Sequence, residues 1–253
     1  VTGSSTYVGG LIGSANGSVF DNVWASGLVT QTASNNAGGL MGAMGTYSNA
    51  WTGLAYGGKL TNSYATGNVS GSASGYTGGL VGNSSGNSIA TSYATGNITG
   101  TGIYVGGLVG YSTTPISSSY ASGNVTNTSS QTGGLVGYSG AAITNAYATG
   151  TVNVTGYSSE RTGGLVGNSG GTVTSSYATG NVTVSSAGTA AYYTGGLIGF
   201  SSNTVTDSYA TGVVSVAGSS AHSIGGLIGY VSGGNVLNSY ASGSVTGSGA
   251  ASY

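Results

Sequence analysis

The sequence predicts an all-β fold, a β-solenoid (parallel β-helix) of about eight repeats of 27–32 residues, with three short strands per rung. Three observations support this prediction. A Gly-Gly-Leu triplet recurs eight times along the 253 residues, an aromatic residue follows each triplet, and no segment has the 3.6-residue period of an amphipathic helix. Gly occupies 53 positions, a content that would strongly destabilise any helix.

The repeat has two anchors at a nearly constant spacing. The Leu of the triplet stands at positions 11, 40, 80, 108, 135, 165, 197 and 227. The aromatic residues of the second anchor form a predicted ladder: Trp24, Tyr64, Tyr93, Tyr120, Tyr147, Tyr177, Tyr209 and Tyr240. The step from Leu to aromatic residue is 12 or 13 residues in seven repeats and 24 in the second. Only the second repeat therefore carries an insertion there.

Three segments of each unit have strand character, taken here from the fifth repeat. They are Gly133–Gly137, Ile143–Ala148 and Val152–Val154, separated by Gly, Asn and Ser. Such a unit cannot enclose a core alone, but stacked copies can, with equivalent strands about 4.8 Å apart and like side chains in columns. Small residues beside the Leu would let the wall bend there. A propeller fits less well, because its blades need four strands.

The composition excludes several functional classes. Charged residues make up 2% of the chain, and the net charge of −1 offers no basic patch for nucleic acid or anionic membrane. No apolar run approaches the length of a transmembrane helix. Cysteine is absent, which rules out disulfides and thiolate metal sites. We expect no cofactor and no metal site.

Catalytic chemistry is not expected either. The three acidic residues, Asp21, Glu160 and Asp207, fall in different repeats, so paired carboxylate catalysis is excluded by distance. The single His222 lies in a variable turn without a Ser or Asp partner pattern. Calcium-binding solenoids need recurring Asp, which this chain lacks. The sequence therefore predicts a protein that is not an enzyme.

The aromatic ladder has two interpretations. In the first, the rings stack from rung to rung in a core or semi-core position; in the second, they form an exposed stripe that binds a glycan or another surface. Ile143 and Tyr147 are four residues apart, which would place them on one strand face and favours stacking inside.

Two polar columns accompany the ladder. The Thr or Ser after each Tyr-Ala pair, as in Thr66 and Thr95, could form an ice-binding face or satisfy turn backbone groups. The Asn residues that begin Asn-x-Ser/Thr sequons at one turn position are better explained as a stacked Asn ladder than as glycosylation sites. They are Asn68, Asn97, Asn124 and Asn181.

We expect one solenoid domain over residues 1–253, with an insertion at about 43–58 in the second repeat. The insertion is dense in apolar residues and is either a flap over the wall or a contact surface for a ligand or subunit. The candidate contact residues are Met44, Tyr47, Trp51, Leu54 and Tyr56.

The repeat also resembles a known family. Gly134-Leu135-Val136-Gly137, together with Asn145 to Gly150, is similar to the GLUG-motif repeat of bacterial surface and secreted proteins. Related repeats occur in large adhesins and in non-catalytic regions of IgA-cleaving metallopeptidases. The resemblance implies an exported bacterial protein with a β-solenoid segment, and it supplies no catalytic residues.

Two functions remain open. The first is a structural rod, secreted or at the cell surface, that stacks end to end into a filament or continues a longer solenoid. The second is an adhesin module that binds a glycan or host surface through its insertion and its variable turns, Gly156–Thr162, Ala187–Thr194 and Ala217–Ile224. Both ends of the sequence correspond to the third strand of the unit, so we expect matching open edges there.

Overall fold

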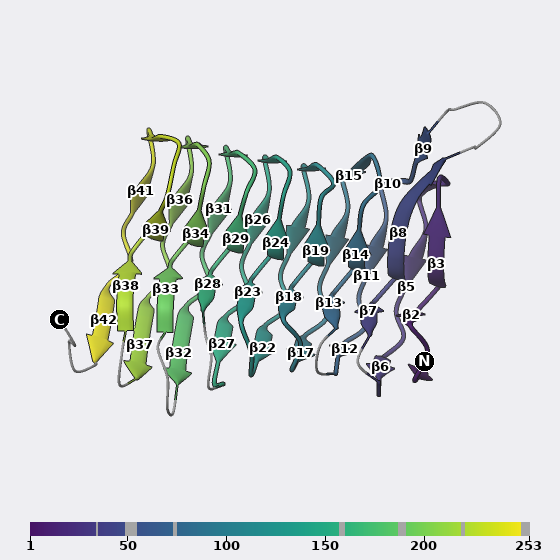
Figure 1. The fold of residues 1–253 in the computed structure, drawn as a ribbon, viewed down its shortest axis with the longest axis horizontal. Helices are drawn as coiled ribbons and strands as arrows, with labels where there is room; N and C mark the ends of the chain where they lie inside the picture. The colour runs from purple at the N-terminus through teal and green to yellow at the C-terminus, as the bar shows by residue number, and fades with distance from the viewer. Residues whose placement is uncertain are drawn as a thin grey trace.

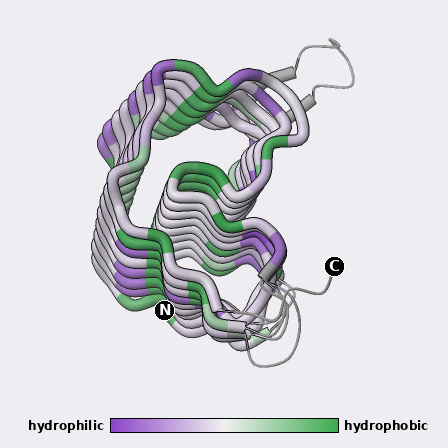
Figure 2. The backbone as a smooth tube through the Cα atoms, turned by 90° about the vertical axis from the view of Figure 1, so that its left-hand side faces the viewer, coloured by the Kyte–Doolittle hydropathy of each residue, from purple (hydrophilic) through white to green (hydrophobic). Residues whose placement is uncertain are grey.

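The computed structural model describes residues 1–33, 35–48, 55–72, 75–156, 160–186, 191–218 and 221–248. Within these residues the regular elements are all β-strands, and the chain coils so that equivalent strands of successive rungs pair in parallel (Figure 1). Viewed along the long axis, the rungs superimpose as a stack of similar outlines (Figure 2). This confirms the predicted parallel β-solenoid of about eight repeats.

Each rung contributes one strand to each of five sheets, which we name A to E in chain order. Sheet A contains β1 (Thr2–Gly3), β6 (Val29–Gln31), β12 (Val69–Ser70), β17 (Ile98–Gly100), β22 (Val125–Asn127), β27 (Val152–Val154), β32 (Val182–Ser186), β37 (Val214–Gly218) and β42 (Val245–Ser248). Sheet B contains β2 (Tyr7–Gly9), β7 (Asn36–Gly38), β13 (Tyr76–Gly78), β18 (Tyr104–Gly106), β23 (Gln131–Gly133), β28 (Arg161–Gly163), β33 (Ala191–Gly195) and β38 (Ala221–Gly225).

The other three sheets complete the rung. Sheet C contains β3 (Ile12–Asn16), β8 (Met41–Ser48), β14 (Val81–Ser84), β19 (Val109–Ser112), β24 (Val136–Ser139), β29 (Val166–Ser169), β34 (Ile198–Ser201) and β39 (Ile228–Val231). Sheet D contains β4 (Val19–Asp21), β10 (Lys59–Thr61), β15 (Ser88–Ala90), β20 (Ile116–Ser117), β25 (Ile143–Thr144), β30 (Val173–Thr174), β35 (Val205–Thr206) and β40 (Val236–Leu237). Sheet E contains β5 (Trp24–Ala25), β11 (Tyr64–Ala65), β16 (Tyr93–Ala94), β21 (Tyr120–Ala121), β26 (Tyr147–Ala148), β31 (Tyr177–Ala178), β36 (Tyr209–Ala210) and β41 (Tyr240–Ala241).

The rung has five strands, and the prediction of three was wrong. Two of the three predicted strands are each divided by a bend. Gly134 and Leu135 form a corner between β23 and β24, and Asn145 begins a corner between β25 and β26. The third predicted strand, Val152–Val154, is β27 as expected.

The expected bend beside the Leu is confirmed, and close backbone contact explains why it needs glycine. A Cβ on Gly134 would lie 2.1 Å from the carbonyl oxygen of Gly164 in the next rung and 3.0 Å from the Cβ of Ala148. The first is far shorter than any contact a side chain tolerates, so only glycine fits at this corner.

The corner between sheets D and E depends on a different backbone state. One non-glycine residue per rung has a positive φ there, near +50°, a region that favours Asn and Asp. These residues are Asn22, Asn62, Thr91, Ser118, Asn145, Ser175, Asp207 and Asn238.

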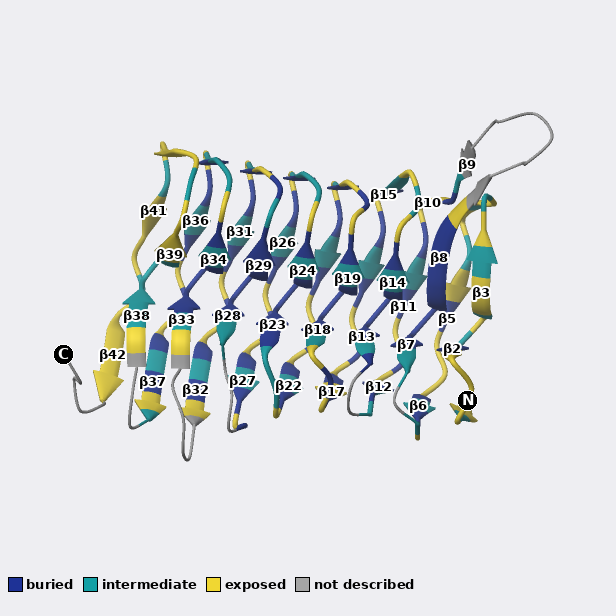
Figure 3. Cartoon of the chain, in the orientation of Figure 1, coloured by how far each residue is buried: buried dark blue, intermediate teal, exposed yellow. Residues whose placement is uncertain are grey.

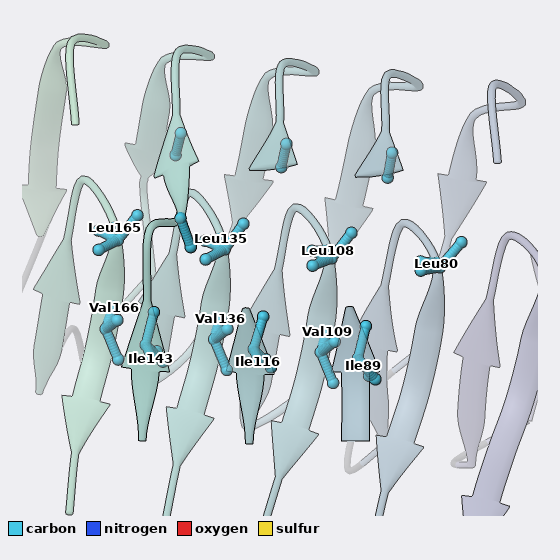
Figure 4. Packing of buried hydrophobic residues seen from close by; sticks show 14 of the residues in the cluster. Leu80, Ile89, Leu108, Val109, Ile116, Leu135, Val136, Ile143, Leu165 and Val166 are labelled. Carbon is cyan, nitrogen blue, oxygen red and sulfur yellow. The ribbon is translucent and has the colours of Figure 1, made fainter. Parts of the chain in front are cut away.

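The core is a set of apolar columns. The Leu of the triplet, the Val after it and the Ile or Val of sheet D are fully buried in the inner rungs and pack together between sheets C, D and E (Figure 4). A second column, the Val and Ile residues of sheet A, packs on the inner face of sheet B. Burying each such side chain stabilises the fold by about 1.5–3 kcal/mol.

The insertion extends from sheet C. β8 runs to Ser48 and pairs with β9 (Ala55–Gly57) in the only antiparallel pairing among the described residues. Met44, predicted to be a contact residue, is fully buried in the core, so that assignment was wrong. Its position on β8, before the strand leaves the wall, accounts for the difference.

The first and last rungs expose the columns that the inner rungs bury (Figure 3). Leu11 is 51% exposed and Leu80 is 0% exposed, although both are the Leu of the triplet. In sheet D, Val236 is 42% exposed and its neighbour Val205 is 0% exposed. The part of the chain that the structure describes contains no helix long and apolar enough to cross a membrane.

Candidate functional site

The aromatic anchors form a continuous stack along sheet E. Neighbouring Tyr rings have centroids 4.9 Å apart from Tyr64 to Tyr209, with interplanar angles of at most 5°. Trp24 caps one end of the stack and Tyr240 the other, and both are exposed, whereas the inner Tyr side chains are half-buried. The predicted ring stacking is therefore confirmed.

The ladder lies on the outside of the wall, not on the face of Ile143. Ile143 and Ala148 are buried, whereas Tyr147 is half-buried, because Asn145 at φ 52° reverses the strand face between Ile143 and Tyr147. The inference that Ile143 and Tyr147 share a face was wrong. Each inner ring is covered on both faces by its neighbours, so the stack presents ring edges and hydroxyls to solvent. Burial raises the pKa of Tyr120, and the neighbouring Tyr147 and Tyr93 raise it further.

The Asn column is a ladder of hydrogen bonds. The Oδ1 atom of Asn68 accepts the backbone N–H of Asn97 at 2.8 Å, and that of Asn97 accepts the N–H of Asn124 at 3.0 Å. This confirms the stacked Asn interpretation. The Thr and Ser residues beside it, such as Thr66 and Thr95, are exposed on the same wall.

A second aromatic cluster, which sequence analysis missed, lies on the outer side of the corner between sheets B and C. We call it the outer seam: Tyr76, Tyr104, Gln131, Arg161 and Tyr193 of sheet B, and Tyr111, Tyr138, Asn168, Phe200 and Tyr230 of sheet C. The side chains from sheet B and sheet C meet because the backbones of the two sheets approach each other closely at this corner. A Cβ on Gly110 of sheet C would lie 2.7 Å from the backbone N of Thr77 in sheet B.

The first half of the outer seam contains four Tyr rings in mutual contact. Tyr76 stacks on Tyr111 with centroids 5.1 Å apart, and Tyr104 meets Tyr111 and Tyr138 edge-on at 5.3 and 5.7 Å. Burial raises the pKa of Tyr104; nearby Tyr76 raises it further, and a hydrogen bond with the Gln131 side chain lowers it.

The second half of the outer seam combines amide, guanidinium and aromatic side chains. Asn168 donates a hydrogen bond to Gln131 at 2.8 Å, and both side chains are buried. Beyond them, the guanidinium carbon of Arg161 lies 4.5 Å from the ring centroid of Phe200. Tyr193 and Tyr230 stack at 4.9 Å and surround Phe200.

A sequence signal for the outer seam exists. Its members stand two residues before the Gly-Gly pair or three residues after the Leu. Across the eight repeats, seven of the first positions and six of the second hold aromatic, amide or guanidinium side chains. Their meeting depends on the sharp Gly-Gly-Leu corner, which brings the flanks together on the outer side.

The remaining candidates show no reactive grouping. In the described residues, no group of three or more His, Cys, Asp or Glu side chains is placed to hold a metal ion. Hydrogen bonds from Thr61 at 2.7 Å and Asn62 at 2.8 Å lower the pKa of Asp21, a structural arrangement at the end of β4. His222 stacks on Tyr192 with centroids 4.9 Å apart.

The structure describes only part of the insertion. Trp51 and Leu54 lie outside the described residues, and Tyr47 pairs with Tyr56 in the backbone register of β8 and β9. Parts of all three variable turns also lie outside them. The insertion as a contact surface therefore stays a prediction.

Comparison with known families gives one match. The model of the GLUG motif matches residues 101–126, 128–153, 158–183 and 220–246. The comparisons with curated proteins and with solved structures give no match. The four matches coincide with the corner, core and ladder positions described above, so residues 101–246 contain four repeats of the GLUG motif.

Proposed function

We propose that this chain is a non-enzymatic structural rod of a secreted or cell-surface protein, and that its β-ladders continue at the two end rungs into further solenoid rungs. Those rungs come from another copy of the chain or from the same polypeptide. The placement outside the cell rests on the family resemblance.

The observation that carries the proposal is the exposure of core columns at both end rungs. Leu11 and Val236 occupy columns that are fully buried in the inner rungs, and the outer edges of sheets A to E carry unpaired N–H and C=O groups. A stacked rung would bury the apolar side chains and extend each parallel ladder. The contact is head to tail, which generates an open filament.

Stacking of copies has one structural requirement. Sheet A has nine strands and sheets B, D and E have eight, because β1 and β42 hold equivalent places at opposite ends. Both lie in the same four-residue sequence, Val-Thr-Gly-Ser, at Val1–Ser4 and Val245–Ser248. In an uninterrupted coil of copies, β42 of one copy would take the place of β1 in the next.

The test uses electron microscopy and light scattering of the 253-residue chain. We expect filaments of many rod lengths, and isolated rods for Leu11→Lys or Val236→Lys, because a lysine at the junction leaves a buried unpaired charge. Thr149→Lys, an exposed position in the middle of the rod, is the matched control and should leave filaments intact. Deleting residues 1–4 should speed assembly by freeing the place for β42.

Monodisperse single rods of the unmodified chain at high concentration would contradict stacking between copies. Filaments that persist in both lysine variants would contradict the end rungs as the junction.

The alternative is an adhesin module that binds a glycan or host surface. One observation favours it: Tyr192 and His222, which lie in two of the variable turns, form an exposed stacked pair. Screening the chain on a glycan array tests this function, with Tyr192→Ala expected to lose the signal. Equal array signals for the unmodified chain and for Tyr192→Ala would contradict a role for this pair.

A further inference from the structure

The outer seam contains the only arginine of the chain. Arg161 begins β28 and points to the outer side of sheet B, because the next residue, Thr162, is buried. Its neighbours in the sheet are Gln131 in the preceding rung and Tyr193 in the following one. A positive charge thus lies in the middle of an otherwise uncharged aromatic and amide seam.

The guanidinium group is incompletely satisfied. The Nε atom of Arg161 is buried and has no hydrogen-bond partner within the described residues. Phe200 covers the group at 4.5 Å, a cation–π contact that contributes about 1 kcal/mol. An unpaired N–H donor of a charged group costs more than this when it is buried.

The acidic side chains of the chain are not placed to neutralise Arg161. Asp21 ends β4 and Asp207 follows β35, both at the corner between sheets D and E. Glu160 directly precedes Arg161, but its carboxylate accepts no hydrogen bond from the buried Nε atom. The seam therefore presents a cation to an anion that comes from outside the chain.

The surroundings indicate what kind of anion fits. Phe200 and Tyr230 stack beside Arg161 with centroids 5.7 Å apart, and Tyr230 is exposed, so an aromatic surface borders the charge. On the other side are the amides of Gln131 and Asn168, followed by the Tyr rings of the first half of the seam. Aromatic faces suit the C–H face of a sugar ring, and amides and phenol hydroxyls suit its hydroxyl groups. A guanidinium pairs with a carboxylate through two parallel hydrogen bonds.

We propose that the outer seam binds an acidic saccharide, with the carboxylate of one sugar residue on Arg161 and its ring against Phe200 and Tyr230. The seam runs along the rod axis, so a linear chain of sugars can extend over Gln131 and Asn168 toward Tyr138. Arg161 and Phe200 lie in inner rungs and are not part of the end-rung junction, whereas Tyr230 lies on β39 of the last rung.

Calorimetric titration with trigalacturonic acid tests the proposal, and three matched comparisons assign the interaction. The fully methyl-esterified trisaccharide has the same rings without the charge, sodium acetate has the charge without the ring, and Arg161→Gln keeps a planar polar side chain without the charge. We expect saturable binding of the acid by the unmodified chain, and binding weaker by about tenfold or more in each comparison. Lys59→Gln removes the other basic side chain of the sequence, which lies on β10 of sheet D. This variant should bind as the unmodified chain does.

Arg161→Met distinguishes binding from packing. If Arg161 binds an anion, this variant loses the acid and gains thermal stability, because the unpaired buried donor is gone. Absence of saturable binding of trigalacturonic acid would overturn the proposal, as would equal affinity for acid and ester or for the unmodified chain and Arg161→Gln. Acetate binding as tight as the trisaccharide would show a simple anion site and overturn the saccharide assignment.

Discussion

At the scale of single residues, one buried column of sheet B shows how tightly the rungs are matched. Its members are Val8, Ala37, Thr77, Val105, Thr132, Thr162, Thr194 and Ile224. Thr132 is satisfied, since its Oγ1 accepts a hydrogen bond from the buried Asn127 at 2.8 Å. The hydroxyls of Thr77, Thr162 and Thr194 are buried without a partner. The column is thus apolar in character, and a hydroxyl is tolerated at a cost.

Thr77→Val should therefore stabilise the rod. The substitution keeps the shape of the side chain, removes an unsatisfied hydroxyl and places a methyl group between Ala37 and Val105, for a gain of about 1 kcal/mol. Thr132→Val is the matched control and should destabilise by about 1–3 kcal/mol, because the buried Asn127 loses the shorter of its two side-chain donor bonds. Chemical unfolding midpoints measure both. A lower midpoint for Thr77→Val would show that its hydroxyl is satisfied in solution.

At the scale of elements, the periodic pattern predicted which residues form strands but not where strands end. Sequence analysis joined Ile143–Ala148 into one strand, since the equivalent places hold Thr91, Ser118 and Ser175 as well as Asn and Asp and so do not consistently indicate a positive φ. That backbone state arises because β25 and β26 are each held by the rungs on both sides. The same bend placed the Tyr ladder outside and the Ile column inside. The recurrence of Gly-Gly-Leu was sufficient for the solenoid, because glycines at one place in every repeat indicate a shared corner.

A Ser column beside that corner is interrupted once in the inner rungs. Ser92 accepts the backbone N–H of Ser63 at 3.2 Å and donates to the carbonyl of Ala90 at 2.8 Å, and other rungs repeat both bonds. Ala146 holds the equivalent place and offers no hydroxyl to the amide of Ser119.

Ala146→Ser should restore the column and stabilise the fold by about 1 kcal/mol, because it supplies an acceptor and a donor to backbone groups already in place. Ser92→Ala should cost a similar amount. Thermal unfolding and hydrogen exchange of the Ser119 amide measure the effect. Unchanged exchange at Ser119 in Ala146→Ser would contradict the missing bond as the reason.

At the scale of the whole molecule, the rod is held by columns of like side chains with very few charges. The sequence predicted the axis, the rung count and the Tyr stack, because these follow from the repeat alone. It did not predict the outer seam or the site around Arg161, because they depend on the angle between sheets B and C and on the rung that each side chain joins. The repeat therefore determines the scaffold. Side chains that differ from the repeat, such as Gln131, Arg161 and Asn168, form the surface features that are specific to this chain.

This architecture predicts an unusual dependence of stability on pH. Most proteins unfold in acid because many paired carboxylates become protonated, and this chain has three acidic residues. Its Tyr side chains instead affect stability at alkaline pH. Burial, followed by neighbouring Tyr side chains, raises the pKa of Tyr111, Tyr177 and Tyr209 above the ordinary 10.0. The folded state therefore favours the neutral phenol, so this stabilisation is complete below the unfolded pKa and is lost as pH rises through the folded pKa.

We expect a nearly constant thermal midpoint from about pH 5 to pH 9 and a cooperative fall above about pH 10. Tyrosinate absorbance should rise together with the loss of β-structure in circular dichroism, because ionised rings cannot remain stacked at 4.9 Å without strong repulsion. Tyr111→Phe is the matched test, since it keeps the ring in the outer seam and removes its ionisation. It should move the alkaline transition to higher pH without changing the free energy of unfolding at neutral pH by more than about 1 kcal/mol. A midpoint that falls as steeply in acid as in alkali would show that carboxylates, rather than the stacked phenols, control the stability of the rod.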